Sequence, residues 1–211
     1  MEIKSKKFEG YKIIKKVISK DLCKHITNYF LLKQKVTKSL FESAYISPYE
    51  TKDGVFNDPQ VTDSFSIYGD INTEVLLSGL RPTVEKIIGK NLMETYTYAR
   101  VYYRGAKLEK HKDRPSCEFS TTLNLGGDQW PIFIDDKKIL LKPGDMLVYE
   151  GCKYEHWRER FDGVYCVQVF LHYADEKNKD LKYDGRPFLG LPSFFKKAGI
   201  IVDQNLRKEV K

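Results

Sequence analysis

The chain has few histidines and no paired cysteines, and both shortages limit the kinds of site it can build. Its four cysteines, Cys23, Cys117, Cys152 and Cys166, are scattered without a CxxC pair. This spacing argues against a disulfide framework or a structural zinc site, so we interpret the cysteines as reduced core residues. With only four histidines in 211 residues, a metal site built from imidazoles has few candidate ligands.

Several other features are absent. No segment is long and apolar enough for a membrane span, and the N-terminal MEIKSKKFEG is not followed by a signal-peptide core. We therefore expect a cytoplasmic protein without a membrane partner. The chain also lacks a GxGxxG motif and regular strand-helix alternation, which argues against a doubly wound nucleotide-binding sheet. It has no internal repeat and no low-complexity tract.

The composition predicts one folded domain over residues 1–211. Hydrophobic residues make up 41% of the chain and aromatic residues 13%, enough for a substantial core. The net charge is +7, and residues 1–40 hold eleven lysines against three acidic residues. A basic region of this kind binds nucleic acid in some proteins, but we interpret it here as a solvated surface.

The chain divides into helical support and loops over residues 1–94, a strand-rich core over 95–175, and an extension over 176–211. A first helix is predicted from a Ser19 cap to about Leu32. A second helix opens at Asn72 and stops at Gly89. Residues 45–70 read as a long loop with short strands that covers a site. Aromatic residues near Phe188–Phe195 are expected to pack the extension against the core.

From Thr95 the sequence changes to short segments rich in β-branched and aromatic residues, separated by Gly, Asp and Pro. Such segments are typical of an antiparallel double-sheet roll, so the predicted fold is mainly β, of the α+β kind, with N-terminal supporting helices. The segments are TYTYARVYY, CEFSTTLNL, WPIFI, KILL, DMLVYEG, EHW and VYCVQVFLHY.

Three polar residues in this core have the pattern of a metal site. His111 and Asp113 are placed at a strand start, where residues i and i+2 face the same side. His156 follows a Pro-Gly-Asp turn and a strand, and strand pairing is expected to bring it to the other two. Two imidazoles and one carboxylate form a facial triad that leaves positions open for other ligands, and Fe(II) is the metal it best predicts. The alternative is a charged turn without metal. His172, at the far end of a strand, is rejected as a ligand and given a packing or substrate-side role.

These residues resemble the 2-oxoglutarate- and Fe(II)-dependent oxygenases, especially the prolyl 4-hydroxylase-like branch. The resemblance covers about residues 95–175. It is carried by Tyr103-Arg-Gly, His111-Lys-Asp113, Leu123-Asn-Leu, Pro143-Gly-Asp and His156.

The resemblance implies a double-stranded β-helix, or jelly-roll, that binds Fe(II) through His111, Asp113 and His156. The cosubstrates would be 2-oxoglutarate and O2, with ascorbate as a supporting reductant. Tyr103 would lie near the cosubstrate carboxylate, and Thr122 at a position that often contacts it. Gln168 would be an inward-facing neighbour on the final strand.

The sequence departs from that branch in one place. A Lys or Arg that pairs with the far carboxylate of 2-oxoglutarate is expected nine or ten residues after the distal histidine, where this chain has Tyr165 and Cys166. Arg158 and Arg160 are the nearest substitutes, since arginine suits a bidentate carboxylate contact. Arg114 is a third candidate, better placed for substrate.

The resemblance predicts hydroxylation of a C–H bond with release of succinate and CO2, most simply at a prolyl residue of a peptide or protein. Two other classes stay open: an oxygenase that modifies nucleic acid, and a non-catalytic jelly-roll binding module. Trp130 and Trp157 are assigned either to a substrate mouth or, more commonly for such residues, to the core. The sequence leaves the oligomeric state open.

Overall fold

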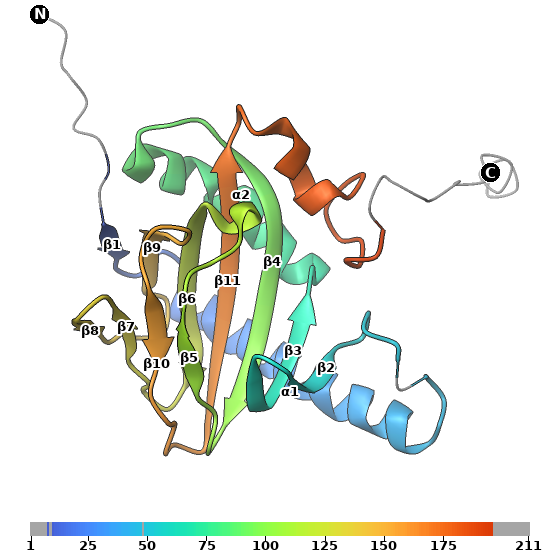
Figure 1. The fold of residues 1–211 in the computed structure, drawn as a ribbon. Coiled ribbons are helices and arrows are strands. Elements are labelled where there is room, and N and C mark those ends of the chain that lie inside the picture. The colour runs from blue at the N-terminus through green and yellow to red at the C-terminus, as the bar shows by residue number, and fades with distance from the viewer. Residues whose placement is uncertain (1–7, 9, 48, 196–211) are drawn as a thin grey trace, which may run out of the picture.

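The computed structural model describes residue 8 and residues 10–47 and 49–195. In this part of the chain, two antiparallel sheets face each other and two helices cover the outer side of the larger sheet (Figure 1). The mainly β fold with supporting helices is therefore confirmed. No helix in these ranges combines the length and the apolar character needed to cross a bilayer. Three of the eleven lysines in residues 1–40, Lys4, Lys6 and Lys7, lie outside the described residues, as do residues 196–211 of the predicted extension.

The larger sheet has seven strands in the order β1-β9-β6-β11-β4-β3-β2. Its central strand, β11, pairs along its length with β4 on one side and β6 on the other. The strands are β1 Tyr11–Ile14, β9 Met146–Glu150, β6 Phe119–Gly127, β11 Tyr165–Asp175, β4 Leu92–Tyr103, β3 Val61–Tyr68 and β2 Val55–Asp58.

The smaller sheet has the order β5-β10-β7-β8. Its strands are short: β5 Leu108–His111, β10 His156–Arg158, β7 Ile132–Ile134 and β8 Lys137–Ile139. Successive side chains along β4 and β11 point alternately toward the helices and toward this smaller sheet. Val101 and Val169 pack in the helix-side core, whereas Tyr102 and Cys166 pack in the interior between the sheets.

Helix α1 spans Lys20–Glu42, and the Ser19 side chain accepts a hydrogen bond from the Leu22 N–H as predicted. The helix continues past the predicted end at Leu32 because no Pro or Gly interrupts it. The predicted end was too early because it relied on a buried apolar face. Leu32 and Val36 are exposed, so the apolar pattern weakens in the second half of the helix.

Helix α2 spans Ile71–Ile88 and contains Pro82. Asp70, rather than a residue further along, caps its start by accepting from Asn72 N–H, and Gly89 ends it in the left-handed conformation as predicted.

The strands predicted within the loop region over residues 45–70 are present, although the second of them, β3, is eight residues long. There β2 and β3 form a hairpin, and β3 adds to the edge of the large sheet by pairing with β4. The alternation of buried and exposed positions in VTDSFSIY is weak, because Ser64, Phe65, Ser66 and Ile67 are all buried. Strand β1 was also not predicted.

The segment after β11 packs against β4 through the short helix η2 Lys179–Gly185. The expectation that aromatic residues fasten this segment is wrong in part, since Phe188 is 54% and Phe194 59% exposed. Polar anchors hold it instead: Arg186, fully buried, forms an ion pair with buried Glu74, Nη2 to Oε1, at 2.7 Å.

Candidate functional site

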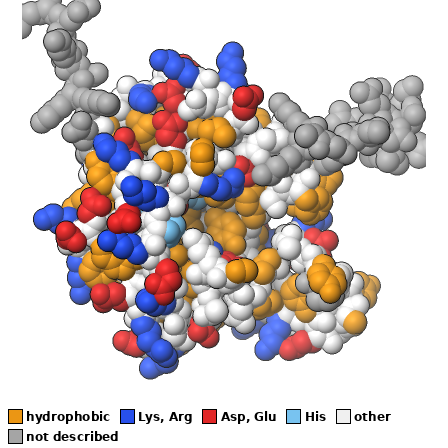
Figure 2. All heavy atoms as spheres, viewed as in Figure 1, with side chains coloured by type: hydrophobic (Ala, Val, Ile, Leu, Met, Phe, Trp, Pro, Cys, Tyr) orange, Lys and Arg blue, Asp and Glu red, His pale blue; other side chains and the backbone are white. Residues whose placement is uncertain are grey.

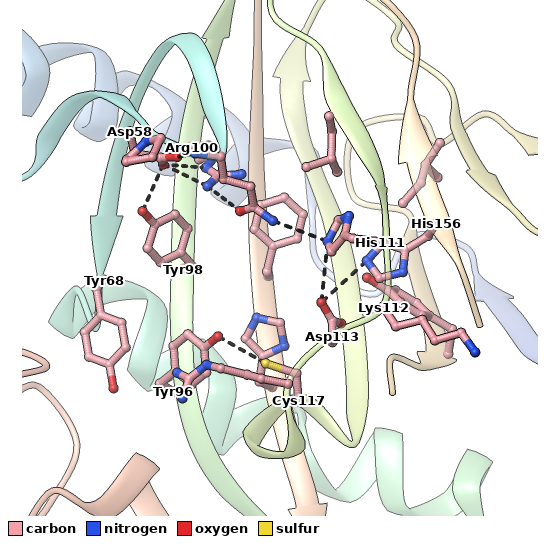
Figure 3. Close-up of a pocket in the computed structure, with 18 residues that line it drawn as sticks. Asp58, Tyr68, Tyr96, Tyr98, Arg100, His111, Lys112, Asp113, Cys117 and His156 are labelled. Atoms are coloured by element: carbon pink, nitrogen blue, oxygen red, sulfur yellow. Dashed lines mark hydrogen bonds and ion pairs between the residues drawn. The ribbon is translucent and has the colours of Figure 1, made fainter. Parts of the chain in front are cut away.

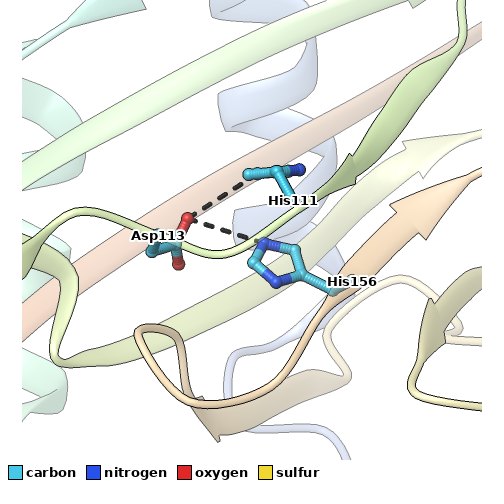
Figure 4. A group of neighbouring side chains, drawn as sticks. All are labelled: His111, Asp113 and His156. Carbon is cyan, nitrogen blue, oxygen red and sulfur yellow. Dashed lines mark ion pairs between the residues drawn. The ribbon is translucent and has the colours of Figure 1, made fainter.

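The pairing of β5 with β10 brings the two predicted histidine ligands together. His111 lies directly opposite His156 in this antiparallel pair, and the ring centroids are 4.3 Å apart. The prediction that His111 starts a strand is wrong: it ends β5, and Asp113 follows in the irregular segment after it. The carboxylate still reaches the imidazoles, since Asp113 Oδ1 lies 3.7 Å from His111 Nε2 and 3.5 Å from His156 Nε2 (Figure 4).

Backbone carbonyl groups orient both imidazoles. His111 Nδ1 lies 2.8 Å from Glu109 O, and His156 Nδ1 lies 3.2 Å from Tyr154 O. A carbonyl can only accept, so in each ring the Nδ1–H donates and the Nε2 lone pair faces the carboxylate. Burial, together with the neighbouring His156, lowers the pKa of His111, which favours the neutral form that binds metal ions.

Asp113 is held from its other side. Its Oδ2 accepts a 2.6 Å hydrogen bond from buried Ser120 Oγ, and its N–H donates to Gly151 O at 2.9 Å. Burial alone would raise the pKa of the carboxyl, but His156, His172 and Ser120 outweigh it and lower the pKa to about 2. The group is therefore an anion at neutral pH, with one oxygen free to face the histidines. No motif in the sequence identified this role of Ser120.

A cavity of about 570 Å³ opens over these three residues. Figure 2 shows the hollow, with histidine surface beside hydrophobic side chains, and Figure 3 shows the residues around it. The lining is strongly aromatic, and its charged groups come mainly from β4 and from the segment after β5. It includes Tyr68, Tyr96, Tyr98, Tyr149, Phe170, Asp58, Arg100, Lys112 and Arg114.

The β2–β3 turn reaches the cavity. Arg100 Nη2 donates to Asp58 Oδ2 at 2.7 Å and to Gln60 Oε1 at 2.8 Å. The Gln60 amide nitrogen in turn lies 3.3 Å from His111 Nε2. The loop prediction for this region is thus confirmed to the extent that its turn lies over the site (Figure 3).

His172 lies beside the triad and not within it. Its Nδ1 is 3.1 Å from Ser120 Oγ, its ring packs on Tyr96 at 4.6 Å, and burial lowers its pKa to about 4. One ligand atom each from His172, Cys117 and Asp113 also lie within 4.8 Å of one another. The Cys117 thiol lies 3.1 Å from the Tyr96 hydroxyl, and burial raises its pKa, so it stays a thiol.

Arg158 is the more suitable of the two arginines proposed for the far carboxylate. It is 1% exposed and points inward from β10, the strand that begins with His156. Its guanidinium lies over Trp130 at 4.9 Å, and Nη1 donates to Trp130 O at 2.5 Å. Nε and Nη2 are buried with no hydrogen-bond partner, and no carboxylate pairs with this cation in the described residues. Arg160, by contrast, is exposed.

The other residues expected near the cosubstrate divide between two faces of the large sheet. Thr122 and Gln168 are buried, and Thr122 Oγ1 and Gln168 Oε1 have no hydrogen-bond partner. Tyr103, expected at the carboxylate, instead lies on the helix side, where its hydroxyl donates to Gln34 of α1. Its neighbour Tyr102 faces the interior, with a fully buried hydroxyl that also has no partner. The parity along β4 that places Arg100 and Tyr98 in the cavity would have identified Tyr102.

Arg114 and the two tryptophans take different positions. Arg114 lines the cavity, lies over Tyr96 and makes a bidentate pair with Asp184 at 2.8 and 2.9 Å. Trp130 is 5% exposed and packs in the interior core, and Trp157 stacks on Phe133 at 5.3 Å. Neither tryptophan lines the cavity.

These donors fit an iron ion and a dicarboxylate. Ligand atoms of His111, Asp113 and His156 all lie within 4.8 Å of one another, and two imidazoles with one carboxylate are a donor set typical of non-haem Fe(II). A buried guanidinium with two unused N–H groups is costly unless an anion reaches it. Arg158, on the same strand as His156, is thus a buried cation with N–H groups available to an anion.

No protein-family model matches the chain, and no curated protein matches its sequence. Solved structures do match its fold. HygX from Streptomyces hygroscopicus, with nickel and 2-oxoglutarate bound, has a TM-score of 0.57 at 11% identity over 79% of this chain and 83% of its own. The epimerase SnoN of nogalamycin biosynthesis, dependent on α-ketoglutarate, has a TM-score of 0.58 at 11% identity over 79% of each chain.

A viral collagen prolyl hydroxylase from Paramecium bursaria Chlorella virus-1, solved as a 2-oxoglutarate complex, is similar to the same extent. Its TM-score is 0.56 at 11% identity, over 79% of this chain and 97% of that chain. The predicted jelly-roll is thereby confirmed. The chain has the fold of the 2-oxoglutarate- and Fe(II)-dependent oxygenases, including prolyl hydroxylases.

Proposed function

We propose that this protein is an Fe(II)- and 2-oxoglutarate-dependent dioxygenase that oxidises a C–H bond of its substrate. One observation carries the proposal: two histidines and a buried arginine without an acidic partner point inward from the same small sheet, and Asp113, just after β5, completes a His-Asp-His cluster. A metal-binding module alone has no need of Arg158, because a buried unpaired cation lowers stability unless a ligand uses it.

When bound, iron and 2-oxoglutarate activate dioxygen and convert the keto acid to succinate and CO2 while the substrate is oxidised. The protein's own residues hold the reacting groups in place. His111 and His156 present Nε2 because their Nδ1–H groups donate to backbone carbonyls, and Asp113 presents Oδ1 because Ser120 holds Oδ2. We assign the far carboxylate to Arg158, whose guanidinium is buried with Nε and Nη2 unpartnered.

A prolyl residue in a peptide or protein is our proposed substrate. The likeness to the viral collagen prolyl hydroxylase structure supports it at the level of the fold. The cavity opens to the surface under the β2–β3 turn, so an extended chain can cross it without unfolding of either sheet. Mass spectrometry of proline-containing peptides after incubation tests this assignment, with the gain of one oxygen atom on proline as the expected result. Oxidation confined to another residue would replace the assignment.

Release of succinate tests the reaction class. Purified protein incubated with Fe(II), ascorbate and 2-oxoglutarate is expected to form succinate, and Asp113→Ala is expected to abolish it, because a metal ligand is lost. Asp136→Ala, which removes an exposed carboxylate in the β7–β8 turn, is the matched control and should retain the activity. If Asp113→Ala were as active as the wild type, the assignment of the metal-binding triad would be wrong.

Binding of 2-oxoglutarate tests Arg158 separately. Calorimetric titration of the Zn²⁺-loaded protein avoids turnover. Arg158→Gln is expected to weaken binding roughly 10- to 100-fold, since hydrogen bonds to a charged group contribute about 1.5–3 kcal/mol. Arg160→Gln, on an exposed side chain two positions along, should change the affinity less than about 2-fold. If Arg160→Gln has the larger effect, the far carboxylate lies at the surface instead.

A further inference from the structure

The imidazole of His172 forms part of the cavity wall next to the triad, and it is not one of the three assigned ligands. It comes from β11 in the large sheet, so it faces the cavity from the side opposite His111 and His156. Its ring packs at 4.6 Å on Tyr96, which in turn stacks on Tyr68 at 4.8 Å. A histidine fixed this rigidly within an aromatic wall presents its nitrogens in set directions.

Ser120 determines which nitrogen of His172 carries the proton. The Ser120 hydroxyl has a single hydrogen, and its shortest contact is 2.6 Å to Asp113 Oδ2, an ionised oxygen that can only accept. That hydrogen is therefore committed to Asp113. The 3.1 Å contact between Ser120 Oγ and His172 Nδ1 must then run the other way, with Nδ1–H donating to the hydroxyl oxygen.

The other nitrogen of His172 is left as an acceptor that faces the cavity. Nε2 has no hydrogen-bond partner in the described part of the chain. It is not one of the fully buried unpartnered atoms, so part of its surface is accessible. Since the residue is only 6% exposed and lines the cavity, its accessible atoms open onto that space. Burial keeps the ring neutral near pH 7, so the Nε2 lone pair is available.

The carboxylates around the cavity are already engaged. Asp58 accepts hydrogen bonds from Arg100, Ser66 and Tyr98, and Asp113 faces the two histidine ligands. A substrate that offers an N–H or O–H group beside the metal thus finds His172 Nε2 as an acceptor with no other partner in the described residues.

We propose that His172 is a specificity-determining residue, whose Nε2 accepts a hydrogen bond from an N–H or O–H group of the substrate next to the C–H bond that is oxidised. The inference rests on the proposed function and adds to it the kind of group the substrate must carry. For a peptide substrate, this group is the backbone N–H of a residue adjacent to the prolyl residue, because a prolyl residue has no N–H itself.

Nitrogen-15 NMR of the imidazole rings tests the acceptor directly in the metal-free protein. With four histidines in the chain, the His172 signals are assigned by their loss in His172→Phe. We expect His172 to be the neutral Nδ1–H form at neutral pH, and Ser120→Ala to move it toward the Nε2–H form. A wild-type His172 protonated on Nε2 would overturn the proposal.

The substrate arm uses the Zn²⁺-loaded protein with 2-oxoglutarate and a short proline-containing peptide. Binding of the peptide is expected to shift the His172 Nε2 resonance, and methylation of the peptide N–H after proline should weaken binding roughly 2- to 10-fold, the worth of one neutral hydrogen bond. A bound peptide that leaves Nε2 unchanged would contradict the assignment.

The two proposals fail in different assays. The protonation state of His172 is measured without metal or cosubstrate, so its failure leaves succinate release unaffected. If the protein released no succinate but His172 had the expected tautomer, the oxygenase reaction would be ruled out, whereas the assignment of Nε2 as a hydrogen-bond acceptor would be retained.

Discussion

Asp113 shows how tightly the surroundings control a single carboxylate. Its backbone is fixed by Gly151, its outer oxygen by Ser120, and only its inner oxygen faces the histidines. Gly151 has to be a glycine for steric reasons: a Cβ there would lie 2.3 Å from Asp113 Oδ2 and 2.6 Å from Ser120 Oγ. The orientation of the ligand thus depends on a residue with no side chain.

Gly151→Ala is therefore expected to weaken metal binding. The added methyl group pushes the Asp113 carboxylate out of line with the imidazoles, and changes of this kind around a ligand typically cost 10- to 100-fold in metal affinity. Titration with Zn²⁺ or Co²⁺ measures the loss. Gly79→Ala is the control, because nothing lies within 4 Å of a Cβ at this exposed position of α2. Equal metal affinity in the two variants would show that Asp113 adapts freely.

At the scale of elements, two segments outside the jelly-roll core complete the cavity. The β2–β3 turn contributes Asp58 and Gln60, and Gln60 donates toward the same His111 Nε2 that a metal requires. Metal binding must therefore release the Gln60 amide. The segment after β11 contributes Asp184, which pairs with Arg114 at the cavity wall and accepts from Tyr68 at 2.7 Å.

This C-terminal segment depends on one buried ion pair. Arg186→Met leaves the buried Glu74 carboxylate without its partner, so the free energy of unfolding is expected to fall by about 3–5 kcal/mol. Glu74→Leu combined with Arg186→Met should recover part of the loss, because no lone charge stays buried. Urea unfolding of the single and double variants measures both effects.

The exposed pair Lys38–Glu42 is the control for that experiment. Both side chains are more than 60% exposed, and Lys38→Met should leave the urea midpoint nearly unchanged. If Lys38→Met and Arg186→Met lowered the free energy of unfolding equally, burial would not explain the contribution of the Glu74–Arg186 pair to stability.

At the scale of the whole molecule, the buried histidines make stability depend on pH. Histidine in an unfolded chain titrates near pH 6.5, whereas burial lowers the pKa of His172 to about 4 and also lowers that of His111. As the pH falls from about 6.5 to 4, these histidines bind protons in the unfolded chain but not in the folded chain. The free energy of unfolding therefore decreases over this range.

The metal-free protein is therefore expected to lose roughly 3 kcal/mol through His172 alone between neutral pH and pH 4. Asp113 and Asp184, whose pKa values are about 2, add a further loss between about pH 4 and 2, since their carboxyl groups are protonated first in the unfolded chain. Urea unfolding across this range measures the slope. His172→Phe should flatten it between pH 6.5 and 4, and an unchanged slope would show that His172 is not the group responsible.

Features that depend on local chemistry could be predicted from the amino-acid sequence. Ser19 and Gly89 mark helix ends because a serine oxygen and a left-handed glycine satisfy terminal backbone groups wherever they occur. The strand segments of the core were identified from β-branched and aromatic runs, and the HxD pair with His156 from residue type and spacing. The division of the chain at residues 94 and 175 stays a prediction.

Which of these side chains meet depends on how the strands pair in the folded protein. Strand register places His111 opposite His156, turns Tyr102 inward and Tyr103 outward, and buries Arg158 while Arg160 stays exposed. Adjacent residues in a strand face opposite sides, so an uncertainty of one residue in the register reverses every such assignment. Ser120 was not identified from the sequence, and its contact with His172 joins residues 52 positions apart because β6 and β11 pair.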